Sequence, residues 1–230
     1  MLYNLVDKFL MNDFSKFIAE EINKGDKTDI NIFDVGCFQG NFSRSLKEKL
    51  NQQAKYFLFD PNPNLALKDF DINRLAFSDI EGNQDYHLNN FFPASGSSLN
   101  KITKDDKLWN FTRKLVTGNI KKSFSSFSVK TNTLDNFCEE NNIKKISVLK
   151  IDTEGSEMKV LNGGKNILQN TQIILVEILD TKKNFNQKYL DVNNLLESNY
   201  KFKNVKEKNI WSLGTLSNMK AIDALFIKSV

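Results

Sequence analysis

The stretch NIFDVGCFQGNFS at residues 31–43 decides the fold. Its first part, Asn31–Val35, is a short apolar run typical of a buried strand, and Asn41–Leu50 has the spacing of a helix. Gly36 and Gly40 stand between them, where the missing Cβ atoms let the backbone turn tightly and let a ligand approach it. The stretch therefore predicts a strand, a ligand-binding turn and a helix in succession.

Short apolar runs and helical stretches alternate along the rest of the chain. We expect further strands at residues 56–59, 74–77, 146–151, 172–178, 201–205 and 221–227, and further helices at 64–70, 156–161 and 187–196. An amphipathic helix over about residues 2–24 precedes them and ends near Gly25. The alternation predicts a doubly wound α/β fold, a parallel sheet with helices on both faces. Because no repeat or linker interrupts the pattern, we predict a single domain over residues 1–230.

The composition is that of an ordinary globular protein, with 40% hydrophobic and 26% charged residues in a chain of 230. Two cysteines are too few for a disulfide scaffold, which fits a reducing compartment. The most apolar runs, at 173–179 and 221–227, are far shorter than the roughly 20 residues that span a bilayer. Asp7 and Lys8 interrupt the N-terminal apolar stretch, which is unlike a signal peptide. We therefore expect a cytoplasmic protein without a membrane span.

The net charge of +4 reflects 32 basic and 28 acidic side chains. Among the basic residues only Arg44, Arg74 and Arg113 are arginines. Proteins that read nucleic acids commonly use the planar guanidinium for paired hydrogen bonds, so the excess of lysine favours a solvated basic surface instead. We expect no nucleic-acid partner.

One long segment, about residues 91–122, does not follow the alternation of strands and helices. It carries Phe91, Phe92, Trp109 and Phe111 among lysines and small polar residues. A long insertion in a compact domain is usually functional or disordered. The sequence leaves two interpretations open, a lid or substrate-contacting loop and a solvated excursion without a function.

Acidic residues follow the first three predicted strands. Asp60 lies in the run FDPNP, at about the 20-residue distance from the glycine turn that is expected of a carboxylate binding ribose hydroxyls. We prefer this role for Asp60 over that of a helix N-cap. Asp79 is placed to contact an adenine amino group, although an aspartate in a glycine-containing turn is nearly as good an interpretation. Asp34, just before the first turn, either binds an ammonium group or orients the turn.

More acidic side chains gather at the ends of the next two predicted strands. Lys150, Asp152 and Glu154 alternate along the chain, so in an extended backbone they project to one side. Glu177 lies inside the otherwise apolar run 173–179. Three carboxylates at adjacent strand ends are unfavourable unless a cation, a proton or Lys150 compensates for their charge. Such clusters are candidates for functional sites.

Taken together, these runs resemble the FkbM-type methyltransferases, a family of the class I S-adenosylmethionine (SAM)-dependent superfamily. The resemblance covers about residues 30–180 and rests on DVGCFQGNFS at 34–43, FDPNP at 59–63, AFSDIEG at 76–82, TLDNF at 133–137 and LKIDTEGSEMKVLNGG at 149–164. It implies a seven-stranded, mostly parallel Rossmann-like sheet whose last strand is inserted antiparallel. It also implies SAM as the cofactor and transfer of a methyl group to a hydroxyl oxygen of a sugar or natural-product acceptor.

The resemblance also implies roles for the residues at the strand ends. The cofactor would be bound by five of them, with the methionine end of SAM beside Asp34, Gly36 and Gly40, the ribose beside Asp60 and the adenine beside Asp79. A second set would face the reacting centre, namely Lys150, Asp152 and Glu154.

A hydroxyl acceptor becomes a good nucleophile only as its proton leaves, and Asp152 or Glu154 can serve as the general base. A second route stays open, in which Asp152, Glu154 and Glu177 bind a divalent cation that lowers the pKa of the hydroxyl. We expect no metal ion, because Lys150 can compensate for the acidic charge. The lone histidine, His87, is a weaker candidate for the base, since its surroundings alternate like a surface strand.

Two other classes of function remain open. The chain could be an oxidoreductase with a nucleotide cofactor, although the G-x-x-x-G spacing at Gly36 and Gly40 differs from the dehydrogenase pattern. It could instead be a non-catalytic binding protein on the same fold, which the retained Asp60 and the run KIDTEG at 150–155 disfavour. The sequence determines neither the acceptor nor the oligomeric state.

Overall fold

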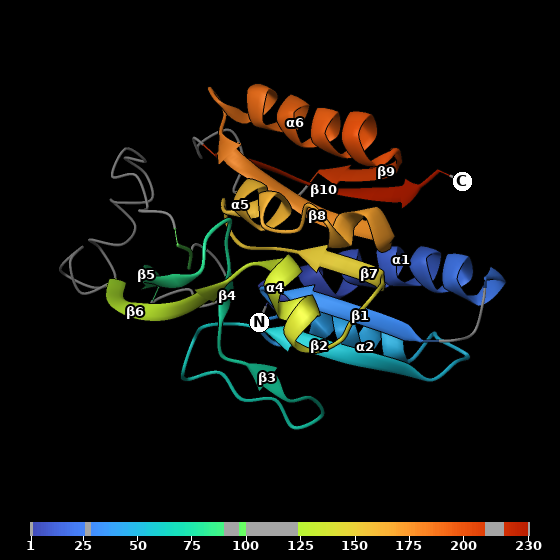
Figure 1. Cartoon of the computed structure of the whole chain (residues 1–230), viewed down its shortest axis with the longest axis horizontal. Coiled ribbons are helices and arrows are strands. Elements are labelled where there is room, and N and C mark those ends of the chain that lie inside the picture. The colour runs from blue at the N-terminus through green and yellow to red at the C-terminus, as the bar shows by residue number, and fades with distance from the viewer. Residues whose placement is uncertain (1, 26–28, 90–96, 100–123, 210–218, 230) are drawn as a thin grey trace.

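A computed structural model describes residues 2–25, 29–89, 97–99, 124–209 and 219–229 (Figure 1). Its main element is a seven-stranded sheet in the order β3-β2-β1-β7-β8-β10-β9. The strands are β1 Ile30–Val35, β2 Ala54–Phe59, β3 Ile72–Asn73, β7 Ile146–Ile151, β8 Thr171–Thr181, β9 Phe202–Asn209 and β10 Met219–Lys228.

The direction of the strands follows the predicted pattern. Strands β3, β2, β1, β7 and β8 pair in parallel, whereas β10 is antiparallel to both β8 and β9 and lies between them (Figure 1). This arrangement confirms the doubly wound, mostly parallel seven-stranded sheet with an inserted antiparallel last strand. Because β1 is central and its neighbours lead away in opposite directions, the carboxyl end of β1 is the switch point where such sheets bind ligands.

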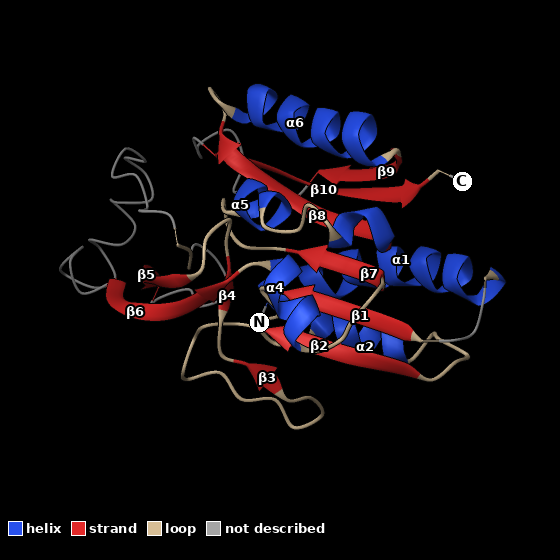
Figure 2. Ribbon diagram, viewed as in Figure 1, coloured by secondary structure: helices blue, strands red, loops and turns tan. Residues whose placement is uncertain are grey.

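Helices cover both faces of the sheet (Figure 2). Helices α1 (Leu2–Lys24) and α2 (Asn41–Lys47) pack with Ile30 and Ile32 of β1 in one buried cluster. Helices α4 (Leu134–Glu140), α5 (Glu157–Asn162) and α6 (Phe185–Asn194) pack with Phe33 and Val35 of the same strand in a second cluster. Alternate residues of a strand point to opposite faces, so one apolar strand supplies both cores.

A second, three-stranded sheet in the order β4-β6-β5 was not predicted. It consists of β4 Ala76–Phe77, β5 Gly82–Asn89 and β6 Phe124–Asn132. The predicted third strand at 74–77 is therefore wrong in part, because residues 76–77 pair with β6. The short strand β3 takes the place beside β2 instead, where the side-chain amide of Asn73 donates to the carbonyl of Leu58 at 3.1 Å.

The predicted helix at residues 64–70 is also wrong, since the structure has only turns and bends there. The Arg74 guanidinium donates to the carbonyl oxygens of Asn62, at 2.6 Å, and of Leu65. These bonds hold the two carbonyls in a loop. The remaining predicted helices and strands are present within a few residues of their expected bounds, and β7 spans the predicted residues 146–151.

The proposed lid or loop at residues 91–122 lies outside the described residues, except for the short piece 97–99. Among the helices that the structure describes, none is long and apolar enough to cross a membrane.

Candidate functional site

A cleft opens at the carboxyl ends of the central strands. Its lining includes the glycine turn after β1, Asp60 after β2 and most of the loop 152–156 after β7. The second sheet contributes Phe77 and Tyr86, and the piece 97–99 completes the lining. The cleft thus lies at the switch point, where the order of the strands predicts a ligand site.

The glycine turn touches the end of β7 directly. Gly36 has φ +76°, and a Cβ atom on it would lie 1.8 Å from the carbonyl oxygen of Asp152. The amides of Gly36 and Cys37 both donate to the carbonyl of Phe59, at 2.9 and 3.1 Å. Glycine is therefore required at position 36 by the close approach of two backbones as well as by its conformation. Gly40 also has a positive φ, +70°, but it is buried at the start of α2 and does not line the cleft.

Asp34 lies beneath the cleft, with no exposed surface. It accepts hydrogen bonds from the Ser43 hydroxyl at 2.7 Å and from the Lys150 ammonium at 3.2 Å. Lys150 also donates to the carbonyl of Gly36 at 3.3 Å and pairs with Asp152 at 3.2 Å. Lys150 thus connects the glycine turn to the loop after β7, and the geometry favours the orienting role for Asp34.

Asp60 is in the cleft lining although only 6% of its surface is exposed. One carboxylate oxygen accepts the amide of Phe38 at 3.2 Å, and the other accepts the amide of Asn62 at 2.9 Å. Burial raises the pKa of this carboxyl, and the two amides oppose the rise. Each carboxylate oxygen can accept a further hydrogen bond, so Asp60 can receive hydroxyl groups of a ligand. We call Asp34 and Asp60 the cofactor-side pair.

Asp79 is exposed and is not part of the cleft lining. Its carboxylate accepts the hydroxyl of the adjacent Ser78 at 3.0 Å. The cleft wall nearest to it in sequence is the apolar run 75–77. The adenine role of Asp79 remains a prediction, and this wall is the alternative surface for a flat ring.

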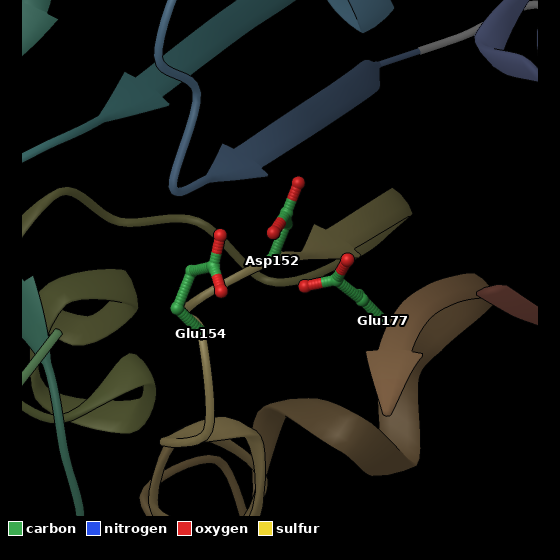
Figure 3. Close-up of side chains that lie close together, drawn as sticks. All are labelled: Asp152, Glu154 and Glu177. Atoms are coloured by element: carbon green, nitrogen blue, oxygen red, sulfur yellow. The ribbon is translucent and has the colours of Figure 1, made fainter. Parts of the chain in front are cut away.

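Three carboxylates converge on the other side of the cleft (Figure 3). Asp152, Glu154 and Glu177 each have one carboxylate oxygen within 4.8 Å of those of the other two. Glu154 has φ +52°, an uncommon conformation for a residue with a side chain, and it turns the loop back toward Glu177. We call these three residues the acidic cluster. The sequence predicted all three members, because parallel strands bring their carboxyl ends to one edge of the sheet.

Glu177 is the member of the acidic cluster whose ionised form is least favourable. Its Oε2 atom is buried and has no hydrogen-bond partner. Burial, followed by the negative charges of Asp152, Glu154 and Asp223, raises the pKa of Glu177 well above its usual range. Asp223 of β10 lies directly opposite Glu177 in the register of the two strands. A group with such a perturbed pKa at the edge of a cleft is a functional-site candidate.

The sequence did not predict how the loop 152–156 is held. Glu157, fully buried at the start of α5, accepts the amide of Gly155 at 2.6 Å and the hydroxyl of Thr153 at 3.2 Å. Lys188 of α6 pairs with Glu157 at 2.7 Å and donates to the carbonyls of Gly155 and Leu179, at 3.0 and 2.9 Å. This buried pair fixes the loop that carries two members of the acidic cluster. The sequence gives no signal for it, because Lys188 resembles every other surface lysine.

Ser98 is a further contact between distant segments. Its hydroxyl donates to the carbonyl of Thr153 at 3.1 Å and lies 3.3 Å from the hydroxyl of Ser156. The backbone of Ser98 pairs with that of His87. His87 itself is absent from the cleft lining, and its Nδ1 atom lies 2.7 Å from the hydroxyl of Ser126 on β6. The second sheet therefore uses His87 as a strand residue, while Ser98 reaches the cleft.

Comparisons with known proteins agree on one family. The FkbM methyltransferase domain matches residues 34–203. The 2-O-methyltransferase NoeI of Sinorhizobium fredii is 30% identical over 176 residues, which are 67% of this chain and 65% of NoeI. The hexuronic acid methyltransferase AglP of Haloferax volcanii is 27% identical over 171 residues, which are 72% of this chain and 61% of AglP. The chain thus spans less than two thirds of the length of either relative.

Among solved structures, a precorrin-6y C5,15-methyltransferase from Geobacter metallireducens matches 95% of this chain and 87% of its own, with a TM-score of 0.40 and 8% identity. So distant a likeness adds nothing to the strand order described above.

Proposed function

The chain belongs to the FkbM methyltransferase family, and from this premise we propose that it transfers a methyl group from SAM to a hydroxyl oxygen of a carbohydrate acceptor. The observation that carries the proposal is that Asp60 and the acidic residues Asp152 and Glu154 line one cleft, after the two strands that flank β1. A cofactor held at Asp60 would present its reactive group to the acidic residues.

The cofactor side has the chemistry for a nucleoside. Asp60 is suited to the ribose, because its buried carboxylate is fixed by two backbone amides and keeps further acceptor capacity. The turn at Gly36 lines the cleft beside Asp60, where its backbone is within reach of the same ligand. The apolar wall at residues 75–77 suits a purine ring. When bound, SAM would supply an electrophilic methyl group on a sulfonium.

The acidic side has the chemistry for activating a hydroxyl. Methyl transfer is an in-line displacement, so much of its catalysis comes from alignment of the acceptor oxygen with the methyl carbon and sulfur. Asp152 is half-buried at the end of β7, where Lys150 holds its carboxylate. A carboxylate so placed can accept the hydroxyl proton as the oxygen attacks, a contribution of typically ~10²–10⁴-fold.

The carbohydrate acceptor is proposed from the relatives. NoeI is named for transfer to an oxygen at a 2-position, and AglP for a hexuronic acid. Both names fit an acceptor rich in hydroxyl groups, and a sugar hydroxyl bound beside carboxylates can donate hydrogen bonds to them.

The test has two parts. Calorimetric titration with S-adenosylhomocysteine, without added metal ions, measures whether the cleft binds the product form of the cofactor. We expect saturable binding that Asp60→Ala abolishes and that Asp85→Ala, an exposed change on β5, leaves unchanged. Transfer of a labelled methyl group from SAM to a panel of glycosides then tests the acceptor class. Absence of binding, or binding of NADH in its place, would contradict the proposal and favour the oxidoreductase or the non-catalytic alternative.

A further inference from the structure

Glu177 is a partly buried acid whose charge has no basic partner among the described residues. It lies on β8 between Val176 and Ile178, which are fully buried, and its Oε2 atom is buried and makes no hydrogen bond. Across the strand pair it faces a buried acid, Asp223. A carboxylate in such surroundings is unfavourable unless it takes up a proton or a cation compensates for its charge.

The nearby cationic side chain, Lys150, is already shared by two other carboxylates. Lys150 lies 3.2 Å from Asp34 and 3.2 Å from Asp152, and these two contacts use its single positive charge. No salt bridge in the described part of the chain joins Glu177 to a lysine or arginine. Glu177 therefore either carries a proton or is compensated by a cation from outside the chain.

The arrangement of the acidic cluster matches the coordination sphere of a hard cation. Its three oxygen atoms lie within 4.8 Å of one another. Oxygen ligands bind Ca²⁺ at about 2.3–2.6 Å, so two ligands on opposite sides of one ion are separated by roughly twice that distance. Carboxylate oxygens without nitrogen or sulfur ligands suit Mg²⁺, Mn²⁺ and Ca²⁺. Figure 3 shows that the three side chains come from the loop after β7 and from β8 and point into a common space.

We propose that Asp152, Glu154 and Glu177 bind one divalent cation of this hard class at the acceptor side of the cleft. The role of the ion rests on the proposed function: beside an acceptor hydroxyl, it would lower the hydroxyl pKa and orient the oxygen. This inference reverses the expectation that Lys150 makes a metal ion unnecessary, because Lys150 does not reach Glu177. The two oxygens of Asp152 can serve both partners, one facing Lys150 and the other facing the ion.

The competing explanation is a proton shared between Asp152 and Glu177. Titration of the whole chain with Mn²⁺, followed by electron paramagnetic resonance of the free ion, separates the two. We expect one site that Ca²⁺ and Mg²⁺ compete for. Glu177→Gln should weaken Mn²⁺ binding at least tenfold, and so should Glu154→Gln, whose side chain on the loop has less influence on folding. Asp180→Asn is the matched control, since Asp180 lies on the same strand with its side chain on the other face.

The outcomes are distinct from those of the proposed function. If Mn²⁺ does not bind at concentrations of about 10⁻³ M, the weak end of the range for protein Ca²⁺ sites, the cluster holds a proton and the cation site is wrong. The same conclusion follows if both glutamine variants bind Mn²⁺ as the unaltered chain does. Titration with S-adenosylhomocysteine in the presence of a chelator tests the proposed function separately, because Asp60 is not a member of the acidic cluster.

Discussion

The cofactor-side pair and the acidic cluster each contribute to the lining of one cleft and are stabilised in different ways. Asp60 receives two backbone amides, and Asp34 receives a hydroxyl and an ammonium group. In the acidic cluster, by contrast, carboxylates face one another, and the buried Oε2 atom of Glu177 has no hydrogen-bond partner. Side chains and amides of the protein pair with both carboxylates of the first group, whereas in the second group the Oε2 atom of Glu177 has no such partner among the described residues.

The difference suggests that the two groups have different roles. Charges that are fixed by amides are suited to binding, because their geometry changes little when a ligand arrives. Charges that repel one another are suited to chemistry, because a small change in their surroundings shifts a proton or an ion. Lys150 connects the two groups through Asp34 and Asp152, so a perturbation at either side has a path to the other.

The largest effect is expected from Gly36→Ala, which should disrupt both the glycine turn and the end of β7. The new Cβ would overlap the carbonyl oxygen of Asp152, so the glycine turn and the end of β7 would have to separate. We expect a loss of about 4 kcal/mol in the free energy of unfolding, together with loss of S-adenosylhomocysteine binding. Urea denaturation and calorimetry measure the two effects.

Gly82→Ala is the control for backbone strain alone. Gly82 has φ +130°, but no heavy atom lies within 4 Å of the position of its Cβ. If Gly82→Ala were as harmful as Gly36→Ala, conformational strain rather than the contact with Asp152 would explain the result.

Asp152→Asn should separate the two sides. We expect methyl transfer to fall by ~10²–10⁴-fold, because the amide cannot accept the acceptor proton. Binding of S-adenosylhomocysteine should change by about threefold or less, because Asp60 and the glycine turn remain in place. Single-turnover transfer and calorimetry provide the measurements, with Asp85→Asn on the surface of β5 as the control. Normal transfer by Asp152→Asn would remove Asp152 from the mechanism.

Lys188→Met tests how the acidic side is held. The change keeps the aliphatic stem but leaves the fully buried Glu157 without its cation, which we expect to cost about 3 kcal/mol of stability. Adding Glu157→Gln should recover part of the loss, since the buried negative charge is then gone. Urea denaturation of the single and double variants gives the coupling energy, and Lys183→Met, an exposed change nearby, is the control. Equal losses in the single and double variants would mean that the pair does not act as a unit.

The sequence predicted the positions of the carboxylates better than their partners. Asp60 and Asp152 follow buried strands, whose carboxyl ends a parallel sheet brings to one edge. Glu177 was expected at the end of its strand but lies within β8, which continues to Thr181. The hydrogen-bond and ion-pair partners of these carboxylates depend on tertiary packing, which no local sequence pattern predicts. Lys188 reaches Glu157 only because α6 folds back over the end of β8. Arg74 likewise binds two carbonyls in and just before the segment 64–70, where the sequence predicted a helix and the structure has a loop.

The second sheet was missed for a different reason. Phe127, Val129 and Thr131 alternate along β6 with exposed residues between them, which is a strand pattern that the sequence does contain. The predicted insertion at 91–122 ends just before β6, and no strand was predicted at residues 124–132. Asp79 lies in an exposed turn outside the cleft lining, and its predicted contact with adenine stays a prediction.

The smallest expected effect is a pH dependence on the cofactor side. Burial raises the pKa of Asp60, so in the protein without cofactor its neutral form persists to a higher pH than that of an ordinary aspartate. The stability that this protonation contributes is lost as the pH rises through the raised pKa. The pH dependence of cofactor affinity has the opposite sign to that of stability, because ribose hydroxyls donate to the ionised carboxylate. Affinity for S-adenosylhomocysteine should therefore fall by up to about tenfold per pH unit below that pKa. Titrations from about pH 8 to about pH 5 measure this change, and the fall should begin at a higher pH than an ordinary aspartate would give. The acidic cluster titrates as well, so the informative quantity is the ratio of affinities between the unaltered chain and Asp60→Asn. A ratio that stays constant with pH would mean that Asp60 does not bind the cofactor as a carboxylate. The assignment of binding to the cofactor-side pair and of chemistry to the acidic cluster would then be wrong for Asp60.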